Sequence, residues 1–487
     1  MKEELEKFLK RYNWEFYEDS LRKITDNVSL FIAKTNGEKK IGILKKENNF
    51  YLSEPHYPQD LFIDSLDLYI NFYPLSFENY LKLKEIINIS PSPCDKKTSF
   101  GTGDRLGLVS SSHLKALKNY SIFPVISQQS PRELIKTHRD FKDVLLKGVL
   151  GVLESGYQGR FGADADHIKD EYYLQEGINA GFSMYTLDIS DFLEKIENLK
   201  KNELQERFRR ISSLSKKIIE KYKGKKLNIS SQEYYEFNEE RLCESAIIYE
   251  RGLDFIEKVY INLKEKIKDF DLEVSIDEGE RDTTLEDHLF VAEYLHEKGI
   301  DFWSLAPKFP GEFQKALDYQ GDIKIFSYEL KKHYILSQKI EGYRLSLHSG
   351  SDKFSIYKIL SEITQKNFHI KTSGTSWLQG VKVIAKFDPQ LFSELYLIAL
   401  NNLEESKKAY KVSIKKEDFP KEVQGDPLVF FEKPEVKQLF HISYGVILDE
   451  KKKEIYDILD RHEKEHYEFV RENIENHLKI LFEEESQ

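Results

Sequence analysis

The chain has 487 residues, 40% hydrophobic and 13% aromatic, which is enough to bury the core of one large domain or of two to three ordinary ones. The formal net charge of −11 excludes a general nucleic-acid binder, which would present a basic face. Cys94 and Cys243 fit no zinc spacing, and neither a signal-peptide segment nor a run of about 18 apolar residues occurs, so we expect a protein of the reducing cytoplasm with no membrane span.

Residues 1–95 are predicted to form an accessory α+β region. A charged, amphipathic first helix is followed by apolar segments that alternate with polar residues and meet at Asn36 and Gly37. Asn-Gly between two such segments is typical of a β-hairpin. The turn-rich stretch 91–97, PSPCDKK, indicates the end of this region.

Between residues 96 and 385, short apolar runs alternate with helical patterns. Alternation of this kind predicts βαβ units and a parallel sheet, and eight repeats are typical of a (β/α)8 TIM-type barrel. A doubly wound sheet is the structural alternative. The expected strands lie in FGTGDRLGL, FPVISQQ, the segment ending GRFGADADH, FSMYTLDI, LEVSIDE, DFWSLAPKF, YRLSLHSG and FHIKTSG.

Two further helical regions are expected. A charged insertion at about 190–262 is predicted to cover one side of the barrel. Residues 386–487 are predicted to be helical, with an interruption at 436–448, VKQLFHISYGVIL. Three histidines of the last helix, His462, His466 and His477, lie in a charged amphipathic pattern, which indicates a solvated face and not a metal site.

Polar side chains follow nearly every predicted strand, where a barrel enzyme keeps its reacting groups. A ring of acids, histidines and basic residues at one mouth suits an anionic, polyhydroxylated substrate. In chain order these residues are Asp104 and Arg105; Gln128, Gln129 and Ser130; Asp164, Asp166 and His167; Asp188; Asp277 and Glu278; Lys308; His348, Ser349 and Ser351; and Lys371, Thr372 and Ser373.

Imidazole combined with carboxylate predicts a divalent cation, with Zn, Mn, Ni or Co favoured over Mg. His167 and His348 are the first choices as ligands because both follow apolar strand runs, although each is equally well a hydrogen-bonding core histidine. His369 precedes Lys371 by two residues, so it is either a ligand or buried in the barrel. His441 either reaches over the mouth as a ligand or only packs.

A small polar loop follows the seventh strand, at Ser349–Ser351. Backbone N–H groups there can hold a carboxylate or phosphate, and simple helix capping by Ser351 or Asp352 is the alternative. The glycine-rich GTGDRLG at 101–107 lacks the lysine and hydroxyl partner of a P-loop, which excludes that reading.

Taken in series, eight motifs resemble those of the tagaturonate epimerase family. They are GTGDRLGL, ISQQSPREL, GRFGADADHIK, AGFSMYTLD, SIDE, LHSGSDKFS, HIKTSGTSWL and LFHISYG, between residues 101 and 445. The resemblance implies a metal-dependent isomerase of hexuronate catabolism that interconverts D-tagaturonate and D-fructuronate, and action of some members on fructose and tagatose. It also implies Asp166 as a base, Glu278 as an acid and His167 as a metal ligand.

The implied reaction inverts C4 of the ketose, which is β to the ketone, so retro-aldol cleavage of C3–C4 and re-addition is expected. The carboxylate of the sugar acid then needs a basic clamp, for which Arg105, Lys308 and Lys371 are candidates, with Gln129 as a further substrate contact. Alternatively, Arg105 only braces the barrel by pairing with an acid. Two other functions stay open: a class II-type metal-dependent sugar aldolase and a non-enzymatic sugar-binding barrel.

Overall fold

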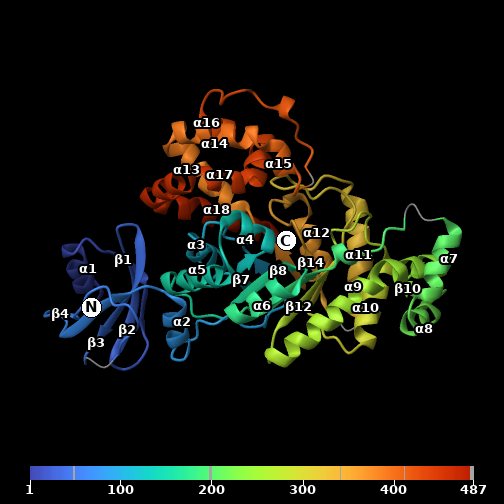
Figure 1. The fold of residues 1–487 in the computed structure, drawn as a ribbon, viewed down its shortest axis with the longest axis horizontal. Coiled ribbons are helices and arrows are strands. Elements are labelled where there is room, and N and C mark those ends of the chain that lie inside the picture. The colour runs from blue at the N-terminus through green and yellow to red at the C-terminus, as the bar shows by residue number, and fades with distance from the viewer. Residues whose placement is uncertain (48–49, 197–199, 341, 411, 483–487) are drawn as a thin grey trace.

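The computed structural model describes residues 1–47, 50–196, 200–340, 342–410 and 412–482. Figure 1 shows four parts: an N-terminal sheet, a central barrel, a helical extension on the far side of the barrel and a group of C-terminal helices above it. Within the described residues, no helix has the length and apolar character that a membrane span requires.

The N-terminal part is an antiparallel sheet with strand order β1-β2-β3-β5-β4. The strands β2 and β3 form the expected hairpin at Asn36 and Gly37, whose φ angles of 49° and 77° suit a tight turn. The elements are α1 (Lys2–Arg11), β1 (Glu15–Lys23), β2 (Val28–Thr35), β3 (Glu38–Lys45), β4 (Leu61–Ile63), β5 (Leu68–Tyr73) and α2 (Phe77–Lys84).

Eight parallel strands close into a barrel, which confirms the (β/α)8 prediction and rules out the doubly wound alternative. All eight overlap the predicted segments, and β6, β8 and β12 each extend one residue beyond them. In chain order they are β6 (Ser99–Gly101), β7 (Phe123–Gln129), β8 (Gly162–Ile168), β9 (Met184–Asp188), β12 (Asp271–Ser275), β13 (Ser304–Ala306), β14 (Arg344–Leu347) and β15 (Phe368–Lys371).

Helices between the strands cover the outside of the barrel. One of them differs from expectation: the helical pattern that begins at Pro131 divides into two helices, because His138 adopts a left-handed conformation with φ of 54°. The connecting helices are α3 (Ser110–Leu117), α4 (Pro131–Thr137), α5 (Phe141–Glu154), α6 (Glu171–Ala180), α9 (Glu239–Lys266), α10 (Leu285–Glu297), α11 (Ile323–Lys339), α12 (Phe354–Ile363) and α13 (Thr375–Phe387).

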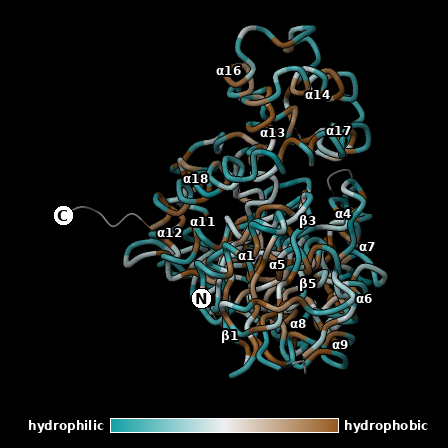
Figure 2. The backbone as a smooth tube through the Cα atoms, turned by 90° about the vertical axis from the view of Figure 1, so that its left-hand side faces the viewer, coloured by the Kyte–Doolittle hydropathy of each residue, from teal (hydrophilic) through white to brown (hydrophobic). Residues whose placement is uncertain are grey.

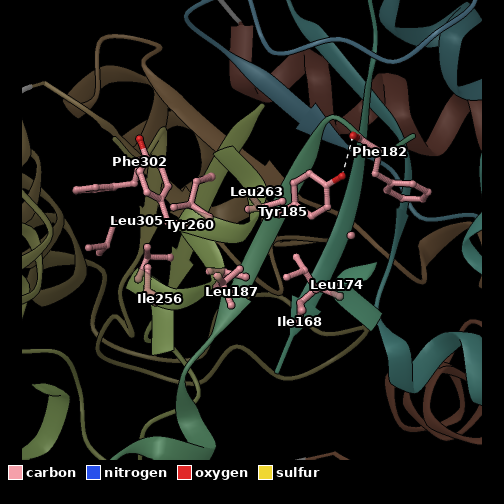
Figure 3. Close-up of a cluster of buried hydrophobic side chains, with 14 of the residues drawn as sticks. Ile168, Leu174, Phe182, Tyr185, Leu187, Ile256, Tyr260, Leu263, Phe302 and Leu305 are labelled. Atoms are coloured by element: carbon pink, nitrogen blue, oxygen red, sulfur yellow. Dashed lines mark hydrogen bonds between the residues drawn. The ribbon is translucent and has the colours of Figure 1, made fainter. Parts of the chain in front are cut away.

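The core between the strands and this helical layer is apolar. Figure 3 shows Tyr185 and Leu187 of β9 packed among side chains of the neighbouring elements, with Leu263 of α9 among them. The Tyr185 hydroxyl donates to the Phe182 carbonyl at 3.0 Å, which satisfies its one buried polar group. This packing holds the strand ends that carry the polar side chains.

The insertion after β9 contains the predicted helices and also a short hairpin. It comprises η1 (Ser190–Phe192), α7 (Lys201–Arg210), α8 (Ser213–Tyr222), β10 (Lys226–Asn228) and β11 (Tyr234–Glu236), and leads into α9. Residues 197–199 of the predicted helical stretch lie outside the described residues.

The C-terminal helices pack together, and part of this group lies at the top of Figure 2. The last two helices also contact the N-terminal sheet, where Lys34 pairs with Asp460 and Glu463. The interruption predicted at 436–448 is wrong, because these residues lie within one helix and their apolar side chains are buried on several faces. The elements are α14 (Pro389–Asn401), α15 (Leu403–Lys407), η2 (Lys416–Asp418), α16 (Pro427–Phe431), α17 (Pro434–Arg461) and α18 (Glu463–Phe482).

The solvated face predicted for the histidines of the last helix is also wrong for two of them. His466 is 2% exposed and His477 is fully buried, because α18 packs against α3, α12 and α13. A helix enclosed by neighbours on several sides buries polar positions that an amphipathic pattern assigns to solvent.

Candidate active site

A small cavity lies at the carboxyl ends of the barrel strands. It has room for about 40 Å³ and opens beside an outer groove of about 750 Å³, with which it shares lining residues. Strand ends and the following loops supply nearly all of its lining, and the C-terminal helical region adds one tyrosine. The lining residues are Arg105, Gln128, Ser130, Arg132, Glu133, Asp166, His167, Asp277, Glu278, Lys315, His348, Ser349, Lys371, Ser373 and Tyr410.

Lys371 forms the floor of this cavity. Its Nζ lies 2.8 Å from Asp164 Oδ2, 2.7 Å from Asp166 Oδ1 and 2.8 Å from Glu273 Oε1, and all four side chains are buried. Burial alone would lower the pKa of Lys371, but the three carboxylates outweigh it and hold that pKa well above its ordinary value. Lys371 is therefore a permanent cation that keeps a buried acidic cluster together.

The carboxylates of this cluster are not equivalent. Burial raises the pKa of Asp164 to about 6. Burial acts on Asp166 in the same direction, but Lys371 and the two neighbouring histidines outweigh it and leave the pKa of Asp166 below its usual range. Asp166 is thus ionised at neutral pH, as a proton acceptor must be.

His348 bridges two acids. Its Nε2 lies 2.6 Å from Glu273 Oε1, and its Nδ1 lies 3.1 Å from Asp277 Oδ1. Burial would lower the pKa of His348, but these carboxylates overcome it and raise the pKa to about 10. The imidazole is held rigidly at the end of β14.

His167 reaches the cavity through an irregularity at the end of β8. The register with β9 shifts between Ala165 and Ile168, and His167 has a left-handed φ of 52°. In a regular strand, successive side chains point to opposite faces, so Asp166 and His167 could not both face inward. The bulge redirects His167 into the site, a common use of bulges next to functional groups.

The rings of His167 and His348 lie in edge-to-face contact. Their ring centroids are 5.0 Å apart at 70°, and His167 Nδ1 lies 3.0 Å from Asp188 Oδ2. Burial lowers the pKa of His167, but Asp166 and Asp188 outweigh it and raise that pKa to about 9. A carboxylate on one ring nitrogen is the usual arrangement that orients a metal-binding histidine.

A donor set for a divalent cation is present beside these rings. Ligand atoms of His167, Asp188 and Glu278 lie within 4.8 Å of one another. Mixed imidazole and carboxylate donors suit Zn, Mn, Ni or Co, as the sequence predicted. The residues fit such an ion, and Glu278, which the sequence assigned to proton transfer, belongs to the same group.

The other two histidines predicted as ligands do not line the cavity. His369 lies deeper in the barrel, where its Nδ1 is 2.8 Å from Ser99 Oγ, and burial lowers its pKa to about 3. His441 is buried in α17 against the loop after β15. A Cβ on Gly374, whose φ is 95°, would lie only 2.5 Å from the His441 ring.

Three of the four residues predicted to bind substrate, Arg105, Lys308 and Lys371, are already engaged within the protein. Arg105 is buried, with its Nε 3.0 Å from Glu133 Oε1 and its guanidinium 3.8 Å from the centre of the Tyr444 ring. Lys308 Nζ donates to the Gly279 and Glu280 carbonyls at 3.0 Å.

Gln129 is buried outside the cavity lining, and its side chain has no hydrogen-bond partner among the described residues.

Four cavity residues were not among the candidates from the sequence: Arg132, Glu133, Lys315 and Tyr410. Arg132 lies in the first turn of α4, two residues after the cap Ser130, and this position next to a strand end is a signal that could have revealed it. Lys315 lies in the long connection between β13 and α11, which has no periodic pattern. Tyr410 comes from the distant helical region, and no local feature points to the barrel mouth.

Comparison with known proteins gives consistent results. A family model described as tagaturonate epimerase matches residues 17–481. A tagaturonate/fructuronate epimerase of Thermotoga maritima is 36% identical, with 96% of this chain and 97% of that protein covered.

Crystal structures of a fructuronate-tagaturonate epimerase from Cohnella laeviribosi have the same fold. The glycerol complex superposes with a TM-score of 0.89 at 28% identity, covering 98% of this chain and 99% of the other. The native crystal structure gives 0.87 at 28% identity, with 98% of each chain covered.

Proposed function

The chain belongs to the tagaturonate epimerase family and is an isomerase, and we propose that it interconverts D-tagaturonate and D-fructuronate with a divalent cation at the barrel mouth. The observation that carries the proposal is the pair His167 and His348. Both rings are oriented by carboxylates and lie in edge-to-face contact beside the ionised Asp166.

The carbon that is inverted limits the chemistry. C4 of the ketose is β to the ketone, so removing an α-proton cannot change its configuration. Retro-aldol cleavage can: a base takes the C4 hydroxyl proton, the electron pair of the C3–C4 bond moves onto C3 as an enediolate with C2, and C4 becomes an aldehyde. Rotation of the aldehyde, re-addition to its other face and return of the proton give the epimer without net loss of atoms.

We assign the C4 proton to Asp166. It is ionised, and Lys371 Nζ at 2.7 Å holds it in place. Because the pKa of Asp166 is lowered, it is a weak base. The pKa of the C4 hydroxyl must therefore also be lowered for the proton to move. A divalent cation held by His167 with Asp188 or Glu278, and by a His348 nitrogen released from its carboxylate partner, would supply that acidification and stabilise negative charge on the cleaved fragment as a Lewis acid.

Glu278 is assigned to proton return. It is exposed and lines both the cavity and the outer groove, so it can exchange protons with water. Glu278 also lies beside His167 and Asp188, which gives it a second candidate role as a cation ligand. The variant Glu278→Gln distinguishes proton transfer from cation binding.

A class II-type aldolase would use the same groups and release the aldehyde. The family match favours the epimerase over the aldolase. Neutral ketoses such as fructose and tagatose have the same reacting carbons, and we propose them as poorer substrates.

Incubation with D-fructuronate tests the proposal. Tagaturonate should accumulate to equilibrium with no three-carbon product. Net cleavage without the epimer would establish the aldolase, and no reaction would leave only a sugar-binding barrel.

A further inference from the structure

Two basic side chains that the proposed chemistry does not use face the same cavity as the reacting groups. Arg132 and Lys315 line both the cavity and the outer groove. Arg132 Nη1 donates to the Ala409 carbonyl at 3.1 Å, and its guanidinium lies 4.8 Å from the centre of the Tyr410 ring. Lys315 Nζ donates to Ser349 Oγ at 2.8 Å, beside His348 in the chain.

These two cations have no direct counterion. Neither forms an ion pair with a carboxylate of the described residues, and the buried Nε of Arg132 has no hydrogen-bond partner among them. The nearby acid Glu133 is engaged by Arg105. Burial, and after it the charges of Arg132 and Arg105, lower the pKa of Lys315 to about 8. The nearby Glu133 and Glu278 offset this lowering only in part.

We propose that Arg132 and Lys315 bind the terminal carboxylate of the sugar acid and so set the preference for a uronate over a neutral ketose. The inference rests on the proposed function, since it takes a uronate as the substrate. Arginine and lysine with free donors are the groups that bind carboxylates in charge-assisted hydrogen bonds.

The three basic residues that the sequence suggested for binding the carboxylate are less suited to that role. Lys371 already contacts three carboxylates, so an anion beside it would be repelled. Arg105 is paired with Glu133 and donates to the His441 carbonyl at 3.0 Å. Lys308 is occupied by two backbone carbonyls. Arg132 and Lys315 combine an open donor with a position on the cavity wall.

The test measures binding with the whole enzyme, by the rise in melting temperature with D-fructuronate and with D-fructose, which differ in the terminal carboxylate. The variants are Lys315→Met and Arg132→Met. Lys408→Met is the matched control, because Lys408 is an exposed lysine of the same outer groove. Lys315→Met should keep or raise the melting temperature without ligand, since it removes repulsion between cations.

The dissociation constant for fructuronate should rise about tenfold to a hundredfold in either cavity variant, while that for fructose changes less than about threefold. The control should change both by less than about threefold. Similar losses for the two ligands, or an unchanged fructuronate constant, would overturn the inference. D-Fructose 6-phosphate distinguishes a carboxylate site from a phosphate site. If the wild type binds it more tightly than fructuronate, and the two cavity variants weaken both ligands by the same factor, the site binds a phosphate instead.

Turnover separates this inference from the proposed function. A wild-type enzyme that binds fructuronate through Lys315 but forms no tagaturonate overturns the function and keeps the carboxylate site. An active enzyme whose Lys315→Met variant keeps its fructuronate affinity overturns the carboxylate site and keeps the function.

Discussion

Replacing Lys371 by methionine should destabilise the barrel in a pH-dependent way. The change leaves Asp164, Asp166 and Glu273 buried together without their shared cation. Breaking a buried ion pair by removing one partner costs about 3–5 kcal/mol of unfolding free energy. The three carboxyl groups can reduce this cost only by taking up protons, so their pKa values in the folded variant should rise.

The sign of the pH effect follows from proton binding. A carboxyl whose pKa is raised in the folded state binds more protons there than when unfolded, so stability falls as pH rises. Each carboxyl that stays protonated in the folded variant adds about 1.4 kcal/mol of loss per pH unit. In the wild type, only Asp164 of the three carboxyl groups has a raised pKa, about 6. Its effect on the free energy of unfolding therefore stops changing once the pH is well above 6.

Urea unfolding at about pH 6 and about pH 8, followed by tryptophan fluorescence, measures the difference. The deficit of the Lys371→Met variant relative to wild type should grow by at least about 1.4 kcal/mol over this interval. Lys308→Met is the control, because Lys308 contacts two carbonyls and should give a deficit independent of pH. An equal deficit at both pH values, or one below about 1 kcal/mol, would refute the reasoning about the acidic cluster.

Four further outcomes are expected. His167→Ala and His348→Ala should each lower the metal content of the purified enzyme, measured by atomic emission, and unchanged content would remove them as ligands. Glu278→Gln should retain the metal but lower kcat by at least about a hundredfold, whereas a loss of metal would make Glu278 a ligand. Dialysis against EDTA should abolish activity and lower the melting temperature; if neither changes, no essential cation is bound. Arg105→Met should lower the melting temperature and weaken fructuronate and fructose equally, because Arg105 braces Glu133, and a loss confined to fructuronate would restore its role as the clamp.

The barrel was predictable because its signals are local. Each strand is a short apolar run that ends in polar residues, and most of the helices between them begin at a capping side chain. The division between α4 and α5 was not predictable. It depends on the left-handed backbone of His138, a conformation that a sequence normally signals with a glycine. The helical conformation of residues 436–448 was not predicted. This part of the helix is buried on several faces, so its apolar residues do not follow the one-sided period of an amphipathic helix.

For the site, the positions of residues at strand ends predicted which side chains share one cavity. They did not predict the hydrogen-bond and ion-pair partners of each side chain. Asp166, His167, His348 and Lys371 all line one cavity, as their positions after apolar runs indicated. The sequence could not show that Lys371 is enclosed by acids, because its partners come from two other strands, Asp164 and Asp166 from β8 and Glu273 from β12. His369 and Lys371 have the same alternation in β15, and only the depth of each in the barrel separates them.

The distribution of charge in the mouth determines how a uronate can lie there. The reacting half holds five buried or half-buried acids, Asp164, Asp166, Asp188, Glu273 and Asp277, while Arg105, Arg132 and Lys315 lie around Glu133 in the other half. A reversed uronate would set its carboxylate against the acids, and like-charge contacts of this kind exclude wrong arrangements. Carboxylate binding at Arg132 and Lys315 therefore leaves C2–C4 for Asp166 and the histidines. A neutral ketose lacks this orienting charge, so it can bind in both directions, and its slower turnover should appear in kcat as well as in KM.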